Sequence, residues 1–197
     1  MWLLFVFISP VYSQGNWELK RNENGIQVYS RTPLSGNRKE IRVLCQFNTS
    51  KNKLIKTLQD INNYGKWVYS TKENKILKTP NPNQVIYYAV SHLPWPLKDR
   101  DLIVELTVTD EAKDNKFQIE AKSLPDYLPK TDTYIRVPYS LALWDVTVVN
   151  DHTLKIDYTF NVDPGGSIPA WLTNATLPVG PYNSFSKLKA VLEREEF

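Results

Sequence analysis

The stretch VDPGGSIPAWLTNATLPVGPYNSFSKLKAVLE, from Val162 to Glu193, decides how the rest of the chain must be arranged. A strand-like run ends at Asp163-Pro164-Gly165-Gly166, and a helical pattern follows at once. Ser167 is a suitable helix cap, and Pro169 suits a first helical turn, where the missing N–H has no partner within the helix. The pattern therefore predicts a long C-terminal helix that begins directly after a sharp turn.

Apolar residues recur at helical spacing along one face of this predicted helix. They are Ile168, Trp171, Leu172 and Ala175 before an interruption at 178–181, and Tyr182, Phe185, Leu188, Val191 and Leu192 after it. Such a stripe packs on a core, and here it would also form one wall of any cavity beneath the helix. The Pro178–Pro181 break is either the hinge of a lid or a kink shaped by packing alone.

Most of the chain before this helix has a hydrophobic period of two, which is typical of strands. The candidate strands are Trp17–Lys20, Ile26–Arg31, Arg38–Phe47, Asn74–Lys78, Gln84–Ser91, Asp101–Thr109, Lys116–Lys122, Tyr134–Val149 and Thr153–Val162. Short, turn-rich connections separate them, and Asn24-Gly25 is a hairpin signal. We expect an antiparallel meander rather than parallel βαβ units.

The alternation also predicts that the sheet has one wet face and one covered face. Leu154, Ile156, Tyr158 and Phe160 share one side of their strand, while Lys155, Asp157 and Thr159 share the other. Two elements can cover the apolar face: a helix over residues 50–61, capped by Thr49 or Ser50, and the C-terminal helix. The predicted fold class is α+β, with a curved antiparallel sheet wrapped around one long helix.

Composition narrows the functional classes. The chain has 197 residues, 42% of them hydrophobic and 23% charged, which fits one domain with a sizeable core. A net charge of +3 without a dense basic run gives no support for a nucleic-acid partner. The single cysteine, Cys45, and two histidines, His92 and His152, exclude a disulfide framework and a Cys/His zinc site, and nothing indicates a cofactor. Cys45 alternates with apolar neighbours and is expected to be buried.

The first residues, MWLLFVFISPVYSQ, are apolar but too short to span a bilayer. We interpret residues 1–13 as a secretory signal peptide cleaved near Ser13, which predicts a secreted or periplasmic protein. The alternative is an N-terminal extension of a cytoplasmic protein. In either case residues 14–197 form the single folded domain.

Several motifs occur in an order that resembles a known family. They are Trp17, Gly25-Ile26-Gln27-Val28-Tyr29, Trp67, the segment Leu93-Pro94-Trp95-Pro96-Leu97-Lys98-Asp99-Arg100-Asp101, and Asp163–Asn174. In this order and spacing they resemble START lipid-transfer domains across residues 16–194. The resemblance implies a helix-grip fold, in which the sheet and the C-terminal helix enclose a hydrophobic tunnel. It also implies a monomeric, non-enzymatic carrier of a sterol, phospholipid, sphingolipid or other apolar ligand, with transient membrane contact.

Two arginines are candidate ligand-binding residues. Arg100 has the same strand parity as Leu102 and Val104, so it should point toward the covered face, while Asp99 and Asp101 point away. A guanidinium there needs a carboxylate, a carbonyl or a ligand head group, so Arg100 either contacts the ligand or forms a salt bridge that holds the 93–99 loop. Arg136 is a second candidate for the cavity, although its parity is open.

The other candidate ligand-binding residues are apolar or aromatic: Trp95, Trp144, Tyr158, Trp171, Ala175 and Tyr182. Pro94 and Pro96 stiffen the loop around Trp95, which we expect to cap the cavity or touch a membrane unless it is ordinarily packed. His92 is expected to form a hydrogen bond at the end of its strand, and His152 to lie in an exposed turn.

Two other functional classes remain open from the sequence. An enzyme of aromatase/cyclase type would need an acid/base pair in the cavity, for which Asp145, Tyr158, Arg100 and His92 are the candidates. A regulatory module would instead fill the cavity with its own side chains, such as Trp144, Tyr158 and Phe160.

Overall fold

The computed structural model describes residues 16–32, 39–111, 115–169 and 179–194. The predicted signal peptide, Trp171, Ala175 and Pro178 lie outside these ranges. The elements follow in the order β1 (Glu18–Glu23), β2 (Ile26–Arg31), β3 (Glu40–Phe47), α1 (Lys51–Gln59), the 3-10 helix η1 (Ile61–Lys66), β4 (Thr71–Asn81), β5 (Gln84–Ser91), β6 (Arg100–Glu111), β7 (Lys116–Ser123), β8 (Ile135–Arg136), β9 (Tyr139–Asn150), β10 (Thr153–Asp163) and α3 (Val179–Leu192).

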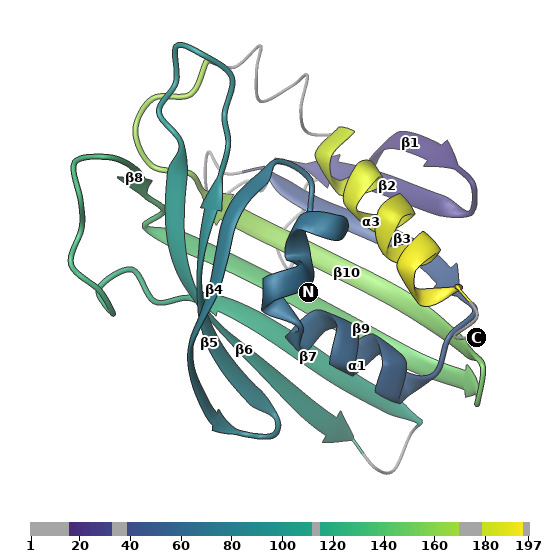
Figure 1. Ribbon diagram of the computed structural model, residues 1–197. Coiled ribbons are helices and arrows are strands. Elements are labelled where there is room, and N and C mark those ends of the chain that lie inside the picture. The colour runs from purple at the N-terminus through teal and green to yellow at the C-terminus, as the bar shows by residue number, and fades with distance from the viewer. Residues whose placement is uncertain (1–15, 33–38, 112–114, 170–178, 195–197) are drawn as a thin grey trace, which may run out of the picture.

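The strands form one curved, open sheet in the order β1-β2-β3-β10-β9-β7-β6-β5-β4 (Figure 1). All pairings along this path are antiparallel, as predicted, but the sheet is not a simple meander. The last strand β10 joins the first three strands to the other six by pairing with β3. One side of the sheet is thus built by β1, β2 and β3, the other by β4 to β9, and β10 lies between them.

Two predicted elements are divided. The run 134–149 is split into β8 and β9 by Val137-Pro138, and β8 pairs in parallel with β6 beside the main path. Proline cannot donate to a strand ladder, which explains the interruption. Ser50 rather than Thr49 caps α1, accepting a hydrogen bond from the Lys53 amide at 3.3 Å. The apolar stripe then continues beyond Gln59 into η1.

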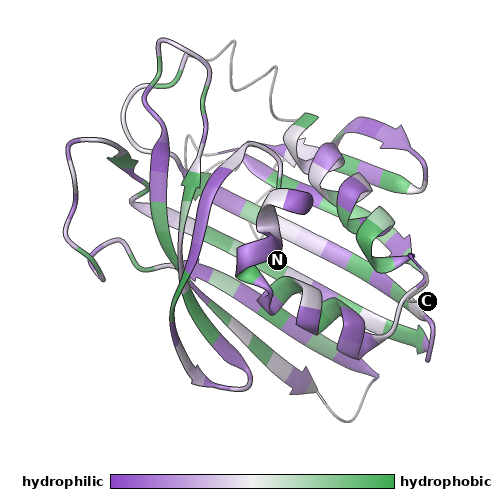
Figure 2. Cartoon of the chain, viewed as in Figure 1, coloured by the Kyte–Doolittle hydropathy of each residue, from purple (hydrophilic) through white to green (hydrophobic). Residues whose placement is uncertain are grey.

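Both described α-helices lie on the concave face of the sheet (Figure 1), and hydropathy alternates along the strands beneath them (Figure 2). The predicted sidedness of β6 and β10 is confirmed, because Val104, Leu106, Leu154 and Ile156 belong to one buried core. Cys45 belongs to the same core, and burial raises the pKa of its thiol. None of the described helices has the length and apolarity that a membrane span needs.

The hairpin between β1 and β2 follows the turn chemistry of its sequence. Asn24 has φ = 52° and Gly25 has φ = 76°, the left-handed conformation that this residue pair tolerates. The hairpin tip packs against α3, where the Asn24 amide donates to the Tyr182 hydroxyl at 2.8 Å. Arg21 stacks over the Tyr182 ring, with its guanidinium carbon 3.6 Å from the ring centroid.

Candidate functional site

The concave face divides into a closed part and a partly open part. Under α1 and α3 the side chains pack without access to solvent: Phe47, Leu54, Leu154, Leu188 and Leu192 are all at most 1% exposed. This part of the face is an ordinary hydrophobic core, closed by helix side chains that fill the space between the layers.

Toward the other end of the strands, apolar side chains face the same concave side but are only half-buried. They are Ile41, Leu102, Ala121, Tyr158 and Phe160, which we call the concave floor. The strand register places them on one surface, since Phe160 pairs with Ile41 and Ala121 pairs with Leu106 of the core. The sheet thus presents an accessible apolar surface on its covered side, beyond the region that the described helices close.

An aromatic cluster stands where the closed part meets the concave floor. The Trp144 ring stacks on Phe185 of α3 with centroids 5.0 Å apart, and Tyr158 lies 4.8 Å from Trp144 and 5.1 Å from Phe185. Phe160 stacks on the outer side of Tyr158 at 6.3 Å. Trp144 and Tyr158, both predicted ligand-binding residues, are therefore brought together, and Phe185 seats α3 on them.

A second aromatic cluster faces the first across the concave side. Its members were not among the ligand-binding residues predicted from the sequence. Tyr64 of η1 lies 4.9 Å from Trp67 and 5.5 Å from Tyr87 of β5. The Tyr64 hydroxyl donates to the Leu58 carbonyl at 2.6 Å. Tyr87 could have been found from its parity with Val85 and Ala89. Tyr64 lies in the 3-10 helix η1 and Trp67 directly follows it, where no simple hydrophobic period applies.

Burial keeps the tyrosines of both clusters neutral. It raises the pKa of Tyr64, Tyr87 and Tyr158; neighbouring phenols raise the pKa of Tyr64 and Tyr158 further, whereas Tyr64 partly offsets the rise at Tyr87. Each is therefore available as a neutral hydrogen-bonding group at any physiological pH. The site offers polar contacts without charge.

Arg100 points toward the covered face, as its parity predicted, and is 2% exposed. Its guanidinium makes no salt bridge with the described residues: it donates to the Lys98 carbonyl, to the Pro164 carbonyl at 3.2 Å and to the Gly165 carbonyl at 3.1 Å. Burial lowers its pKa, partly offset by Asp99. Arg100 thus fastens the turn after β10 to the base of the 93–99 loop through carbonyls, and not through a salt bridge, which was one of its two expected roles.

The turn that Arg100 holds requires glycine. Gly165 has φ = 67° and Gly166 has φ = 63°, in the left-handed region. A side chain at Gly165 would also place its Cβ 3.1 Å from the Arg136 carbonyl oxygen. The glycines let the chain leave β10 closely packed against β8.

Arg136 lies on the opposite, convex face, so its expected place in the concave cavity is wrong. It forms a two-pronged ion pair with Asp101, with N–O distances of 3.1 and 2.8 Å, and both side chains are almost fully buried. The same guanidinium donates to the carbonyls of Pro125, Leu128 and Pro129. Arg136 pairs in β8 with Asp101 in β6, which determines its face. Its role here is to hold the loop before β8 against the sheet.

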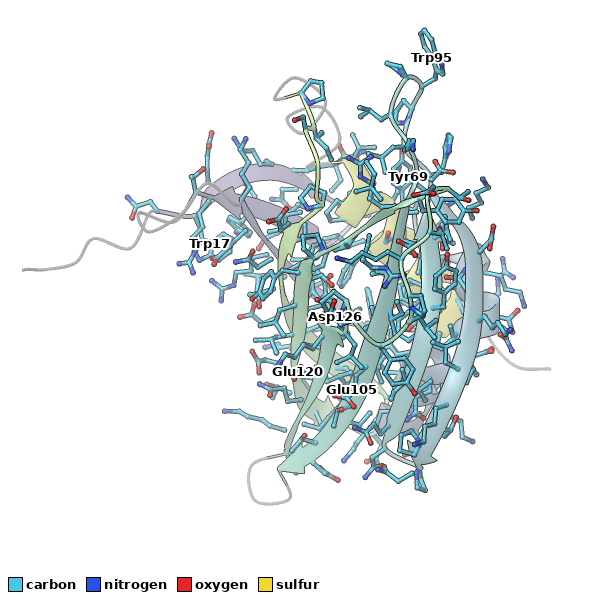
Figure 3. All side chains as sticks on the ribbon, turned by 90° about the vertical axis from the view of Figure 1, so that its left-hand side faces the viewer. Trp17, Tyr69, Trp95, Glu105, Glu120 and Asp126 are labelled. Carbon is cyan, nitrogen blue, oxygen red and sulfur yellow. The ribbon has the colours of Figure 1, made fainter. Side chains whose placement is uncertain are left out.

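Trp95 stands alone at the tip of the 93–99 loop (Figure 3) and is 91% exposed, so ordinary packing of this side chain is excluded. The base of the loop is held by Asp99, which accepts from the Leu93 amide at 3.1 Å and pairs with Lys72 at 3.0 Å. Asp99 also contacts His92 Nδ1 at 2.9 Å, which confirms the expected hydrogen bond at the end of that strand. A firmly held loop thus presents an indole to the solvent.

The candidates for acid/base chemistry do not come together. Asp145 lies on the convex face, where it accepts from Gln118 at 2.8 Å. Every nitrogen of Arg100 is bonded to a carbonyl, and His92 is an exposed residue at the loop base. His152 lies in an exposed turn, as predicted. Of the four candidates, Arg100 and Tyr158 face the concave side, but the Arg100 guanidinium is taken up by carbonyls and the described residues offer Tyr158 no partner for proton transfer.

Comparison with known proteins fits this geometry. The family model of the START domain matches residues 9–196. The chain belongs to the START family. A STAR-related lipid transfer protein of Xanthomonas axonopodis has the same fold, with a TM-score of 0.78 and 27% identity over 90% of this chain and 99% of that one.

Two further relatives extend the comparison. Human StAR-related lipid transfer protein 5 has the same fold, with a TM-score of 0.73 and 14% identity over 90% of this chain and 86% of that one. An uncharacterized protein of Pseudomonas aeruginosa is 26% identical over 179 residues, which are 91% of this chain and 88% of the relative. The curved open sheet with a C-terminal helix is therefore the START helix-grip arrangement.

Proposed function

We propose that the protein is a non-enzymatic carrier that binds one hydrophobic ligand against the concave floor, beside α3, and transfers it between membranes. The observation that carries this proposal is the half-buried apolar surface on the covered side of a START sheet. Each methylene that moves from water to such a surface gains about 0.8 kcal/mol, so a 16-carbon chain gains on the order of 10 kcal/mol. A lipid tail would be the natural occupant.

The geometry favours this function over the two alternatives. A regulatory module with a filled cavity would bury Trp144, Tyr158 and Phe160 completely, whereas Tyr158 and Phe160 remain half-buried. An enzyme of aromatase/cyclase type would require a convergent acid and base, but Asp145, Arg100 and His92 point to different places. The chemistry that the site offers is apolar contact with a few neutral hydroxyl groups.

The test uses a variant that blocks the floor. Ala121 lies on the concave side and its neighbour Lys122 on the convex side, so Ala121→Trp fills the site while Lys122→Trp adds the same ring outside it. After incubation with liposomes of mixed cellular lipids, we expect native mass spectrometry to show one bound lipid per wild-type chain. Ala121→Trp should reduce the occupancy and the rate of transfer between vesicles at least tenfold, and Lys122→Trp should change neither.

A lipid-free wild-type protein in this assay would contradict the proposal. Overpacking a core costs about 1–3 kcal/mol, so the folding of Ala121→Trp is checked by thermal unfolding. Leu102→Phe, a smaller enlargement on the same floor, is the second blocking variant.

We further propose that Trp95 inserts into the surface of the membrane from which the ligand is taken. Trp95 is a large apolar group with a polar N–H, the type of side chain that favours a membrane–water interface. Trp95→Ala is expected to weaken binding to phosphatidylcholine vesicles about tenfold in a sedimentation assay, while detergent-delivered ligand binds as before. Tyr127→Ala removes another exposed aromatic ring and should leave vesicle binding unchanged. Equal effects of both changes would argue against a specific role for the loop.

A further inference from the structure

We infer that the ligand is an uncharged lipid with an oxygen acceptor, such as an ester, ketone or hydroxyl oxygen, which accepts a hydrogen bond from the Trp67 indole. This inference rests on the proposed function, because it concerns the ligand of the same concave site. It is carried by three features: an unpaired buried donor, facing neutral phenols, and the lack of charge along the concave faces of the central described strands.

The first feature is the Trp67 indole nitrogen. Trp67 is 7% exposed, and its Nε1–H is buried without a hydrogen-bond partner. An indole is only a donor, so it can be satisfied only by an acceptor that enters from outside the described contacts. Leaving a buried donor unpaired is unfavourable, and native proteins rarely do so without a functional reason.

The second feature is the position of Trp67 among groups that face the concave side. Its ring packs edge-on against Tyr64, which packs against Tyr87 of β5. The Tyr158 phenol raises the pKa of Tyr64, and the Tyr87 phenol raises the pKa of Tyr158, so the three rings lie near one another. They do so although β6, β7 and β9 separate β5 from β10 in the sheet. The curvature of the sheet therefore brings the hydroxyl groups of opposite strands toward one another, with Trp67 on the β5 side.

Tyr158 adds a second group that a ligand oxygen could use. Its hydroxyl makes no hydrogen bond with the described residues, whereas Tyr64 is already bonded to the Leu58 carbonyl. Since burial keeps the phenol neutral, it can donate to an oxygen or accept from a hydroxyl. Trp67 and Tyr158 are thus two neutral hydrogen-bonding groups that are available to ligand oxygens in an otherwise apolar site.

The third feature is charge. On β5, β7, β9 and β10, the described residues that face the concave side are uncharged, and on β6 the same is true of Leu102, Val104, Leu106 and Val108. Arg100, at the end of this surface, already uses its guanidinium for three carbonyls. A phosphate, carboxylate or ammonium beside Trp67 would lose its hydration without gaining a counter-charge, which is strongly unfavourable. The recognised group should therefore be neutral.

The experiment compares three ligands of similar chain length, delivered from methyl-β-cyclodextrin: octadecane, methyl palmitate and ionised palmitate. The wild-type protein is expected to bind methyl palmitate about tenfold more tightly than either of the others. In ¹H–¹⁵N spectra, methyl palmitate should move the Trp67 indole signal, which is assigned by its loss in Trp67→Phe. Trp67→Phe should abolish the preference for the ester and leave octadecane binding unchanged.

The controls separate this inference from the proposed function. Trp17→Phe removes an indole N–H outside the proposed site, where the ring packs against Arg31, and should retain the ester preference. Tyr158→Phe should reduce the preference and also serves if Trp67→Phe does not fold. Tightest binding of palmitate, or an ester preference that survives both Trp67→Phe and Tyr158→Phe, would overturn the inference but leave the carrier function intact. If none of the three ligands binds, the proposed function fails and the inference fails with it.

Discussion

Replacement of Asp101 by leucine is expected to lower the free energy of unfolding by about 3–5 kcal/mol. Asp101 is 2% exposed and is the carboxylate partner of Arg136, which is 8% exposed. Without Asp101 the guanidinium remains buried with carbonyl partners only, and an uncompensated buried charge is the costly outcome. Chemical denaturation monitored by tryptophan fluorescence measures the change, with the denaturant slope as a check on two-state unfolding.

The same strand supplies the control for this result. Asp110 on β6 forms an exposed ion pair with Lys51, so Asp110→Asn should cost less than about 1 kcal/mol. In the double variant Asp101→Leu, Arg136→Met, the loss should be smaller than the sum of the two single losses, because no unpaired charge is left. Equal losses from Asp101→Leu and Asp110→Asn would show that the buried pair does not stabilise the fold.

Replacement of Phe185 by alanine is the second large change, with an expected loss of about 3–5 kcal/mol. Phe185 is 3% exposed and contacts Trp144, Tyr158 and Phe47, so its removal leaves a cavity between α3 and the sheet. Because this cavity adjoins the concave floor, we expect a bound lipid to recover part of the loss. A ligand that binds the folded state alone stabilises it by about 2.7 kcal/mol at 100 times its Kd.

Thermal unfolding with and without lipid measures both effects. Lys187→Ala on the same helix changes an exposed side chain, and it should alter the unfolding midpoint by less than about two degrees with or without lipid. If lipid raises the unfolding midpoint of Phe185→Ala no more than that of the wild-type protein, the ligand does not bind beside the aromatic cluster.

The hydrophobic pattern was sufficient to predict most of the fold. Period-two alternation gave the strands and their covered side, because burial of one face is a local property of each strand. The pairing of β3 with β10 could not be read in this way, since it depends on contacts between residues more than one hundred positions apart. The 3-10 helix η1 was not predicted because Ile61 has the helical spacing of the apolar stripe of α1.

The candidate site was predicted in part, and the errors have physical causes. Parity correctly placed Arg100 and Tyr158 on the concave side, because β6 and β10 are regular. Trp144 was named only as a bulky aromatic residue, since both faces of the run 134–149 are apolar, and its side follows from its pairing with Tyr158. Arg136 was misplaced since Pro138 separates β8 from β9 and cancels the alternation between them. Arg100 was expected either to contact the ligand or to form a salt bridge. The salt bridge is replaced by carbonyls of Lys98 and of the turn after β10, and such backbone acceptors leave no trace in the pattern of side chains.

The attachment of α3 has a mechanical consequence. Among the described residues, α3 and Glu193 after it are hydrogen-bonded to the loops and the turn beside the sheet through their side chains: Ser184 accepts from the Tyr69 amide, Glu193 accepts from the Asn48 amide, and Lys189 donates to the Asn24 carbonyl. The strand ladder, by contrast, is held by main-chain hydrogen bonds throughout. Displacement of the helix would thus separate side-chain contacts without breaking a main-chain hydrogen bond of the sheet, so the proposed carrier would be able to admit a ligand while its strand order stays the same.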